Sequence, residues 1–397
     1  MTSEVFTTST FDIKKEREQL ASIHLRVRRG EEKNFIAEIH AGDYHNEWTF
    51  RMSDDDLEDI NKEFQDAAEA SIADVEDWEA LTDDEVQSLI RPLAKQGHSA
   101  YLWVFQDDDV RSKLEELLAR HIRSRVPITI QVVSESLFLP WELIYPPSAK
   151  NNVDVFLKNF WGLNYIIYRI IPPWYLPPTT IGVEARIKIG LLTDTSLHFV
   201  KNKEIPFFER LNNTGHISLI KLEELYPDRV AEGFTKFEIF WGNDFNIAHF
   251  ACHAEYEGGP NKTKFTLTND FPISLQDMDD LTIKGKPLII MNACESGTLN
   301  PLYTKSFASY FIQRGAVGVV ATECVIPDQF AAAFAERLYT LLLKKQKRLG
   351  ESLLSTRKYF YKKGNPTGLL YSMYAPPSIR VLVQEDLNEQ TTKNSRR

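Results

Sequence analysis

The sequence predicts an α/β protein with a mostly parallel sheet flanked by helices, preceded by an N-terminal α+β accessory domain. From Arg186 onward, apolar β-rich runs alternate with helix-like stretches, the pattern of parallel strands joined by helical crossovers. Before that point, short strand-like runs are followed by amphipathic helices, which is typical of an α+β unit. The length of 397 residues leaves room for roughly two to three domains.

The accessory domain is expected to span residues 1–105. The runs SIHLRVRRG, NFIAEIHAG and NEWTFRM are separated by turn residues and predict a small antiparallel meander. Ser53 is expected to cap the acidic helix that follows it. The segment TDDEVQSLIRPLAKQG predicts a second helix that stops at its final glycine, Gly97. Nothing in this domain suggests chemistry.

Residues 106–178 are expected to form a bridging subdomain. DDDVRSKLEELLARHIRSR predicts an amphipathic helix, and PITIQVV predicts a strand. In LFLPWELIYPP, Trp141 and Glu142 are expected to anchor this subdomain to the sheet that follows. The run FWGLNYIIYRIIPPWYLPP contains an Asn and an Arg and ends in prolines, so it predicts a buried strand and a linker rather than a membrane span.

The third unit spans residues 179–384, and the polar residues 385–397 are expected to be a disordered tail. Strands are predicted at IKIGLL, HISLI, FNIAHFA, PLIIMNA, AVGVVAT and SIRVLV. QFAAAFAERLYTLLLKK and GESLLSTRKYFYKKG predict helices. No period of roughly 20 to 50 residues repeats, so a solenoid is excluded.

Composition and charge exclude several functional classes. The net charge of −10 opposes attraction to phosphate backbones, so we expect no direct nucleic-acid binding. Three cysteines are too few for a disulfide framework, and the first residues lack a secretory pattern, so we expect a reducing cytoplasm. The EGGP turn lacks the spacing of a phosphate-binding loop, which disfavours a nucleotide enzyme.

Two reactive side chains end apolar runs about 40 positions apart, His253 after FNIAHFAC and Cys294 after PLIIMNA. Side chains just past the carboxyl ends of parallel strands lie in one crevice. His253 and Cys294 therefore meet if their strands are neighbours. An imidazole beside a thiol can take its proton and later protonate a departing amine. The pattern predicts a His/Cys dyad.

Several motifs together resemble the CHAT family, a branch of the caspase-like cysteine peptidases. They are HFACHA, IIMNACESG and GAVGVVATECVIPDQFAAAFAERLY, with LPWELIYP and GLLYSMY resembling the domain borders, and the resemblance covers roughly residues 125–384. It implies a caspase-like fold, with His253 as general base and acid and Cys294 as nucleophile. It also implies an oxyanion hole formed by the backbone N–H groups of Cys294 and Ala254. The family often has glycine at this second position, where alanine restricts the backbone.

The substrate pocket is predicted more loosely. In caspase-like folds, residues at the end of the first core strand and around the catalytic loops line the S1 pocket. The carboxylates near strand ends here are Asp194, Glu295, Glu323 and Asp328. A carboxylate in the pocket would favour Lys or Arg at P1. Each of the four could equally cap a helix or lie on the surface.

A zinc cluster of His249, Cys252 and His253 is the alternative for this region. On a strand the two histidines lie about 13 Å apart, with the cysteine on the opposite face, so they cannot share one ion. We therefore expect no metal and no cofactor. His249 is interpreted as a histidine buried in the sheet, and Cys252 and Cys324 as packing residues.

Two functions remain open. The first is a latent intracellular cysteine endopeptidase that cleaves a specific protein target once a separate regulatory or sensor protein acts. The CHAT resemblance implies a role in antiviral defence or cell death. The second is a catalytically quiet interaction scaffold on the same fold, and the presence of both His253 and Cys294 argues against it.

Overall fold

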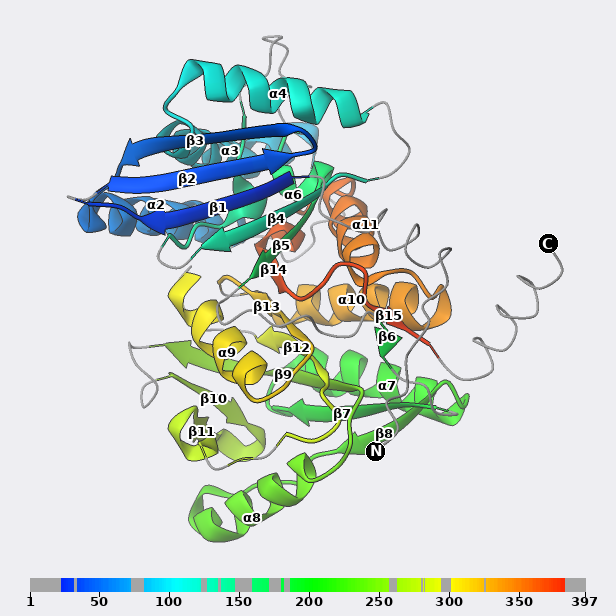
Figure 1. Ribbon diagram of the computed structural model, residues 1–397. Coiled ribbons are helices and arrows are strands. Elements are labelled where there is room, and N and C mark those ends of the chain that lie inside the picture. The colour runs from blue at the N-terminus through cyan, green and yellow to red at the C-terminus, as the bar shows by residue number, and fades with distance from the viewer. Residues whose placement is uncertain are drawn as a thin grey trace, which may run out of the picture.

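The computed structural model describes residues 23–31, 34–72, 82–122, 127–134, 137–146, 159–170, 180–181, 186–256, 263–279, 281, 283–293, 301–324 and 326–382 (Figure 1). The α-helices within these ranges are α2 (Asp54–Ile72), α3 (Asp83–Val104), α4 (Asp108–Ile122), α6 (Trp161–Asn164), α7 (Ile205–Asn213), α8 (Val230–Trp241), α9 (Pro301–Gln313), α10 (Asp328–Tyr339) and α11 (Leu349–Tyr361). The expected linker at 172–178 and tail at 385–397 lie outside the described residues.

The N-terminal sheet has the order β3-β2-β1-β4-β5 in the described chain. Its strands are β1 (Ile23–Arg29), β2 (Asn34–Ala41), β3 (Tyr44–Arg51), β4 (Thr129–Ser134) and β5 (Ile166–Ile170). The first three form the predicted antiparallel meander, whereas β1, β4 and β5 pair in parallel. This one sheet therefore takes strands from both the expected accessory domain and the expected bridging subdomain.

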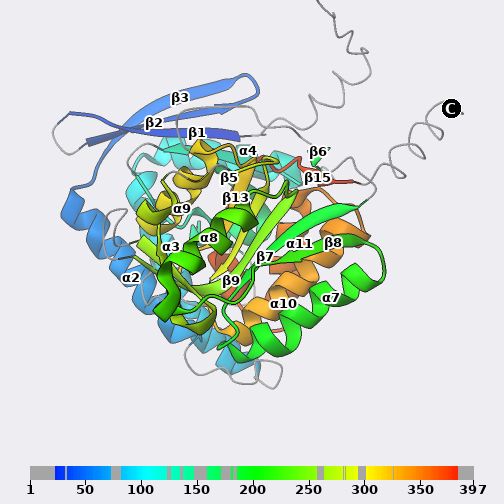
Figure 2. The same cartoon turned by 90° about the horizontal axis from the view of Figure 1, so that it is seen from below.

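Helices α2, α3 and α4 lie on one face of this sheet (Figures 1 and 2). Ser53 caps α2 as predicted, since its Oγ accepts the N–H of Asp56 at 3.1 Å. Helix α3 does not stop at Gly97, which is a correction to the sequence-based expectation. A Cβ at this glycine would lie 1.9 Å from the carbonyl oxygen of Leu143. Gly97 therefore serves the close approach of α3 to the η1 turn (Trp141–Leu143) rather than a helix end.

The second sheet joins eight strands of the described chain: β7 (Ile187–Thr193), β8 (Ile217–Lys221), β9 (Ile247–Tyr256), β10 (Thr263–Leu267), β11 (Phe271–Ser274), β12 (Leu288–Ala293), β13 (Gly318–Thr322) and β14 (Tyr371–Tyr374). The central ladder β8-β7-β9-β12-β13 is parallel, as predicted. Antiparallel strands β14 and β10-β11 extend it. The predicted fold class is confirmed.

Helices cover both faces of this sheet (Figure 2). One face, including Ile247 and Ile290, packs in a hydrophobic core with residues of α7, α10 and α11. The other face, including Phe250 and Met291, packs with α8 and α9. The alternation of side chains along each buried strand explains why these strands are apolar throughout.

The C-terminal run SIRVLV is not part of the main sheet, contrary to expectation. Its strand β15 (Arg380–Val381) pairs in parallel with β6 (Thr180–Ile181) in a separate small sheet. The edge position beside β13 is taken by β14, from the GLLYSMY motif. In the described ranges no helix combines the length and apolar character that crossing a bilayer requires.

Candidate active site

His253 lies at the point where β9 changes partners. The parallel ladder between β9 and β12 reaches the pair Cys252 and Ala293, the last described residue of β12. On its other side, β9 pairs in parallel with β7 as far as Ala251, and from His253 onward it pairs there in antiparallel fashion with β10, His253 opposite Thr266. The histidine is thus within the strand rather than past its end, but it lies just beyond the central ladder, and its side chain is 23% exposed.

Asp194 is the carboxylate that the structure brings to His253. It follows β7 directly, and its backbone N–H donates to the carbonyl of Ala251 at 2.8 Å, which fixes it beside β9. Its Oδ1 accepts the N–H of Ser196 at 2.8 Å, and its Oδ2 lies 3.6 Å from Nε2 of His253. The Asp194 side chain is fully buried, and Oδ2 accepts no hydrogen bond within the described chain.

The other predicted site residues have different positions. Ala254 is buried on β9 opposite Phe265 of β10. Asp328 begins α10 and its Oδ2 accepts the backbone N–H of Phe199 at 3.0 Å, which ties the segment after β7 to that helix. Cys294 and Glu295 lie outside the described residues.

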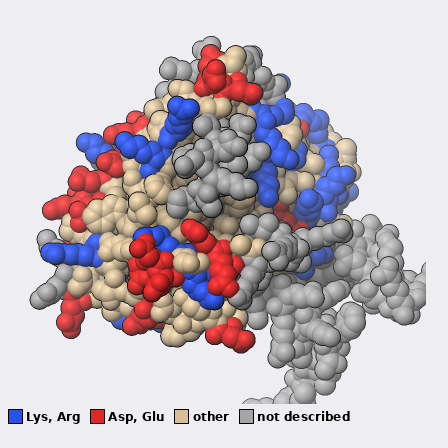
Figure 3. Space-filling view, turned by 90° about the horizontal axis from the view of Figure 1, so that it is seen from above, with Lys and Arg blue, Asp and Glu red and all other residues tan. Residues whose placement is uncertain are grey.

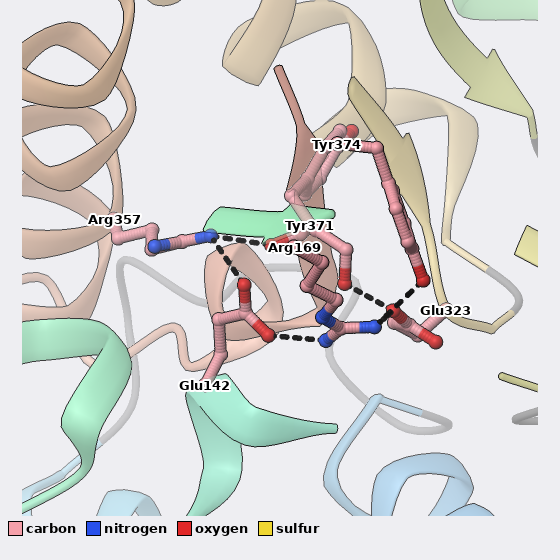
Figure 4. Close-up of polar contacts among 7 residues, drawn as sticks. Glu142, Arg169, Glu323, Arg357, Tyr371 and Tyr374 are labelled. Carbon is pink, nitrogen blue, oxygen red and sulfur yellow. Dashed lines mark hydrogen bonds and ion pairs between the residues drawn. The ribbon is translucent and has the colours of Figure 1, made fainter. Parts of the chain in front are cut away.

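Glu323 is buried in an ion-pair cluster between the two sheets (Figure 4). Its Oε1 accepts hydrogen bonds from Arg169 of β5 and from Ser372 of β14. Arg169 also pairs with Glu142 of η1, and Glu142 in turn pairs with Arg357 of α11 at 3.3 Å. Glu142 therefore anchors the N-terminal part to the second sheet, as its sequence context predicts.

The charges in this cluster shift one another's pKa values. Burial raises the pKa of the Glu323 carboxyl, and Arg169 opposes that rise. Burial alone would lower the pKa of Arg169, but Glu142 and Glu323 raise it well above its usual value. Burial lowers the pKa of Arg357 to about 10, against the influence of Glu142. Both guanidinium groups therefore remain charged at neutral pH.

His249 is a buried histidine of the sheet, as predicted. It is fully buried on β9, with Nε2 2.8 Å from Oε1 of Glu204 and Nδ1 3.1 Å from the hydroxyl of Tyr339. Burial raises the pKa of the Cys252 thiol and that of the Cys324 thiol, which fits their expected packing role. Across the described ranges, no group of three or more His, Cys, Asp and Glu side chains could hold a metal ion.

Charge is unevenly spread over the surface. On the face shown in Figure 3, acidic and basic side chains both occur, with a larger group of Lys and Arg at the right of the view and smaller groups at the left. Despite the net charge of −10, this face is therefore not uniformly acidic.

Comparison with known proteins finds relatives of the segment that forms most of the second sheet. Residues 196–378 match the family model of the CHAT domain. This segment includes every strand of the second sheet except β7. This segment therefore resembles a CHAT domain. A probable protease of Vitiosangium sp. (strain GDMCC 1.1324) is 33% identical over 253 residues, 59% of this chain and 32% of that protein.

The fold of the CHAT domain and its N-terminal extension is also found in solved structures. Two crystal structures of the separase–securin complex of Saccharomyces cerevisiae contain a chain that superposes with TM-scores of 0.52 and 0.50. The identity is 11% in both, over 94% and 93% of this chain and 31% of the matched chain. The chain thus spans about a third of the length of these relatives.

Sequence reasoning missed three polar residues that are connected to β9 and β12, the two strands that lead to His253 and Cys294. Glu204, Asn292 and Tyr371 are buried and hydrogen-bonded to one another in series. One signal was available, because Asn292 interrupts the apolar strand PLIIMNA two positions before Cys294. A polar side chain inside a buried strand needs a partner, which its neighbours in sequence do not supply.

Proposed function

We propose that this chain is a latent cysteine endopeptidase in which His253 and Cys294 form the catalytic dyad. The register between β9 and β12 is the observation that carries the proposal. The two strands are parallel neighbours, and Ala293 pairs with Cys252. Continuing that register by one residue would pair Cys294 with His253, and adjacent strands are only about 4.8 Å apart.

The proposed chemistry follows from these two groups. His253 takes the proton of the Cys294 thiol, and the thiolate attacks the carbonyl carbon of the scissile peptide bond. Backbone N–H groups of Ala254 and Cys294 hold the negative oxygen of the tetrahedral intermediate. His253 then gives its proton to the departing amine, and water hydrolyses the remaining thioester.

Asp194 is proposed as the carboxylate that recognises a Lys or Arg at P1. It follows the first strand of the CHAT sheet's central ladder and lies beside His253, whereas the oxygen Oε1 of Glu323 is already bound by Arg169 and Ser372. Because Asp194 is fully buried, a substrate cation would reach it only after the surrounding chain rearranges. That burial supports a latent resting state.

The proposed target is a specific protein, and the proposed activator is a separate regulatory or sensor protein. The matched relatives are about three times as long as the matched region, so the similarity identifies neither the target nor the activator, and both must be found by experiment. The scarcity of cysteines and the CHAT resemblance support a cytoplasmic role in antiviral defence or cell death.

A peptidyl acyloxymethyl ketone with Arg at P1 tests the dyad, because only an activated thiolate displaces its leaving group. We expect an adduct on Cys294, in the chain incubated with its candidate activator, that is lost in His253→Ala and Cys294→Ala. Cys324→Ala is the matched control and should label normally, since this thiol is buried. Partner-dependent cleavage that persists in Cys294→Ala would refute Cys294 as the nucleophile, and partner binding with no adduct and no cleavage by the parent chain would leave an interaction scaffold.

The role of Asp194 is tested with Asp194→Asn on paired substrates that have Arg or norleucine at P1. If Asp194 binds the P1 cation, only the Arg substrate loses kcat/KM, by about 100-fold for a lost charged hydrogen bond of about 2–3 kcal/mol. An equal loss for both substrates would show that Asp194 acts through His253 instead.

A further inference from the structure

We propose that Glu204 is a positioning residue for the reaction, holding the ends of β9 and β12 at a fixed separation. The inference rests on the proposed dyad, because these two strands lead to His253 and Cys294. Glu204 ends a π-helical turn, η2 (Val200–Glu204), that directly precedes α7. Single π-helical turns are rare and occur frequently at functional sites.

The carboxylate of Glu204 joins the two strands directly. Its Oε1 accepts a hydrogen bond from Nδ2 of Asn292 on β12 at 2.8 Å. The same oxygen lies 2.8 Å from Nε2 of His249 on β9. Since a carboxylate only accepts hydrogen bonds, Nε2 of His249 carries a proton and donates it. One oxygen thus bridges neighbouring strands, four positions before His253 and two positions before Cys294.

The outer ends of this bridge are fixed as well. Oδ1 of Asn292 accepts the hydroxyl of Tyr371 at 2.5 Å, and Nδ1 of His249 lies 3.1 Å from the hydroxyl of Tyr339. All five residues are buried. Rotating any of these side chains would leave a buried polar group without a partner, which is costly. The network therefore admits one arrangement of the two strands.

The Glu204 bridge also lies on the face of the sheet that carries the His253 side chain. Side chains alternate along a strand, so His249 and His253 are on the same face of β9. Asn292 pairs with Ala251, the residue midway between them, and so shares that face. Tilting or sliding β12 against β9 would move the residue after β12 relative to His253, and Glu204 opposes this motion.

Packing alone does not explain a carboxylate here. The Glu204 side chain is 1% exposed, and its Oε2 accepts no hydrogen bond within the described chain. Burying a carboxylate with incomplete hydrogen bonding is unfavourable compared with an apolar residue of similar volume. The buried Glu204 carboxylate thus lowers the stability of the fold while it fixes β9 relative to β12, and this combination is typical of a positioning residue.

The test uses the pH dependence of iodoacetamide alkylation at Cys294, followed by peptide mass spectrometry on the full chain. Alkylation reports the thiolate and needs no natural substrate. Glu204→Ala is expected to lower the rate at neutral pH at least tenfold and to move the profile toward that of His253→Ala. Glu204→Gln keeps an oxygen that can accept from Asn292 and should remain within about threefold of the parent chain.

If Glu204→Ala does not fold, Tyr371→Phe tests whether the Glu204 network positions the dyad. This change removes only the hydroxyl that orients Asn292, and the ring keeps its stacking on Phe334. We expect a two- to fivefold slower alkylation. Tyr310→Phe is the matched control, because its buried hydroxyl donates to the carbonyl of Met278 outside the network, and it should leave the rate unchanged.

The outcomes separate the two proposals. A folded Glu204→Ala or Tyr371→Phe variant that melts earlier but keeps the parent profile would show a merely structural network and overturn this inference. A parent profile identical to that of His253→Ala, both without and with the candidate activator, would instead overturn the dyad, whatever the Glu204 variants do.

Discussion

The substitution Arg169→Met is expected to destabilise the protein strongly, because this arginine neutralises two buried carboxylates. Its guanidinium group pairs with Glu142 and Glu323 and also donates to the hydroxyl of Tyr374 at 2.9 Å. Methionine fills a similar volume without any donor. After the change, Glu142 still pairs with Arg357 at 3.3 Å, whereas the Glu323 carboxylate keeps a hydrogen bond from the hydroxyl of Ser372 but no ion pair within the described chain.

The expected loss is about 3–5 kcal/mol of unfolding free energy, the usual cost of removing one partner from a buried ion pair. For a chain of this length it corresponds to a fall in Tm of about 4–6 °C. Adding Glu323→Gln to Arg169→Met removes the stranded charge and should recover about 2 kcal/mol.

The loss should also depend on pH. Burial raises the pKa of Glu323 above its ordinary value of 4.5, and without Arg169 nothing as strong opposes that rise. The folded state then binds a proton that the unfolded state releases, so the free energy of unfolding falls as pH rises above that value. The difference between Arg169→Met and the parent chain is therefore expected to be larger at about pH 8 than at about pH 5.

Thermal unfolding followed by circular dichroism at both pH values measures these effects. Lys221→Met is the matched control, because its 2.8 Å pair with Glu209 is exposed and such pairs contribute about 0–1 kcal/mol. If Arg169→Met melted within about 2 °C of the parent at both pH values, the cluster would not hold the two sheets together as argued.

Two further predictions concern groups that the fold buries. Iodoacetamide at about pH 8 should label Cys252 and Cys324 only after unfolding in urea, because burial raises both pKa values, and rapid labelling of either in the folded chain would contradict the described packing. Gly97→Ala should cost about 1–3 kcal/mol or more in urea denaturation, since its Cβ would overlap a backbone oxygen of η1. Gly242→Ala, where the nearest atom is 3.1 Å away, should cost less, and equal losses would contradict the close approach of α3.

The central features of the fold could be predicted because they depend on local patterns. Runs such as FNIAHFA and PLIIMNA are apolar throughout since both faces of their strands are covered, and this property is visible in the sequence. The dyad was expected on the condition that these two strands are neighbours, and the parallel register of β9 and β12 meets that condition. The roles of His253 and Cys294 remain predictions.

The parts that could not be predicted depend on contacts between distant residues. Glu323 was a reasonable pocket candidate from its place after a strand, but its partner Arg169 lies 154 positions earlier. Likewise, Glu204 and Asn292 are 88 positions apart, so neither suggests the other. The glycine at 97 resembled a helix stop because the turn that packs against it comes much later in the chain.

Hydrogen bonds and an ion pair connect the N-terminal part to the candidate site through Tyr371. Its carbonyl oxygen accepts a hydrogen bond from Arg357, which pairs with Glu142 of the N-terminal part (Figure 4). Its hydroxyl donates to Asn292, the neighbour of Glu204. Tyr371 of β14 therefore connects two buried clusters, the ion pairs around Glu142 and the hydrogen-bond network around Glu204. A hydrophobic core that runs from β1 to α10 adds apolar contacts along the same boundary. A partner that displaced the N-terminal sheet would disturb Glu142 first and Asn292 through Tyr371, so the fold offers a contiguous physical route by which an activator could act on β12.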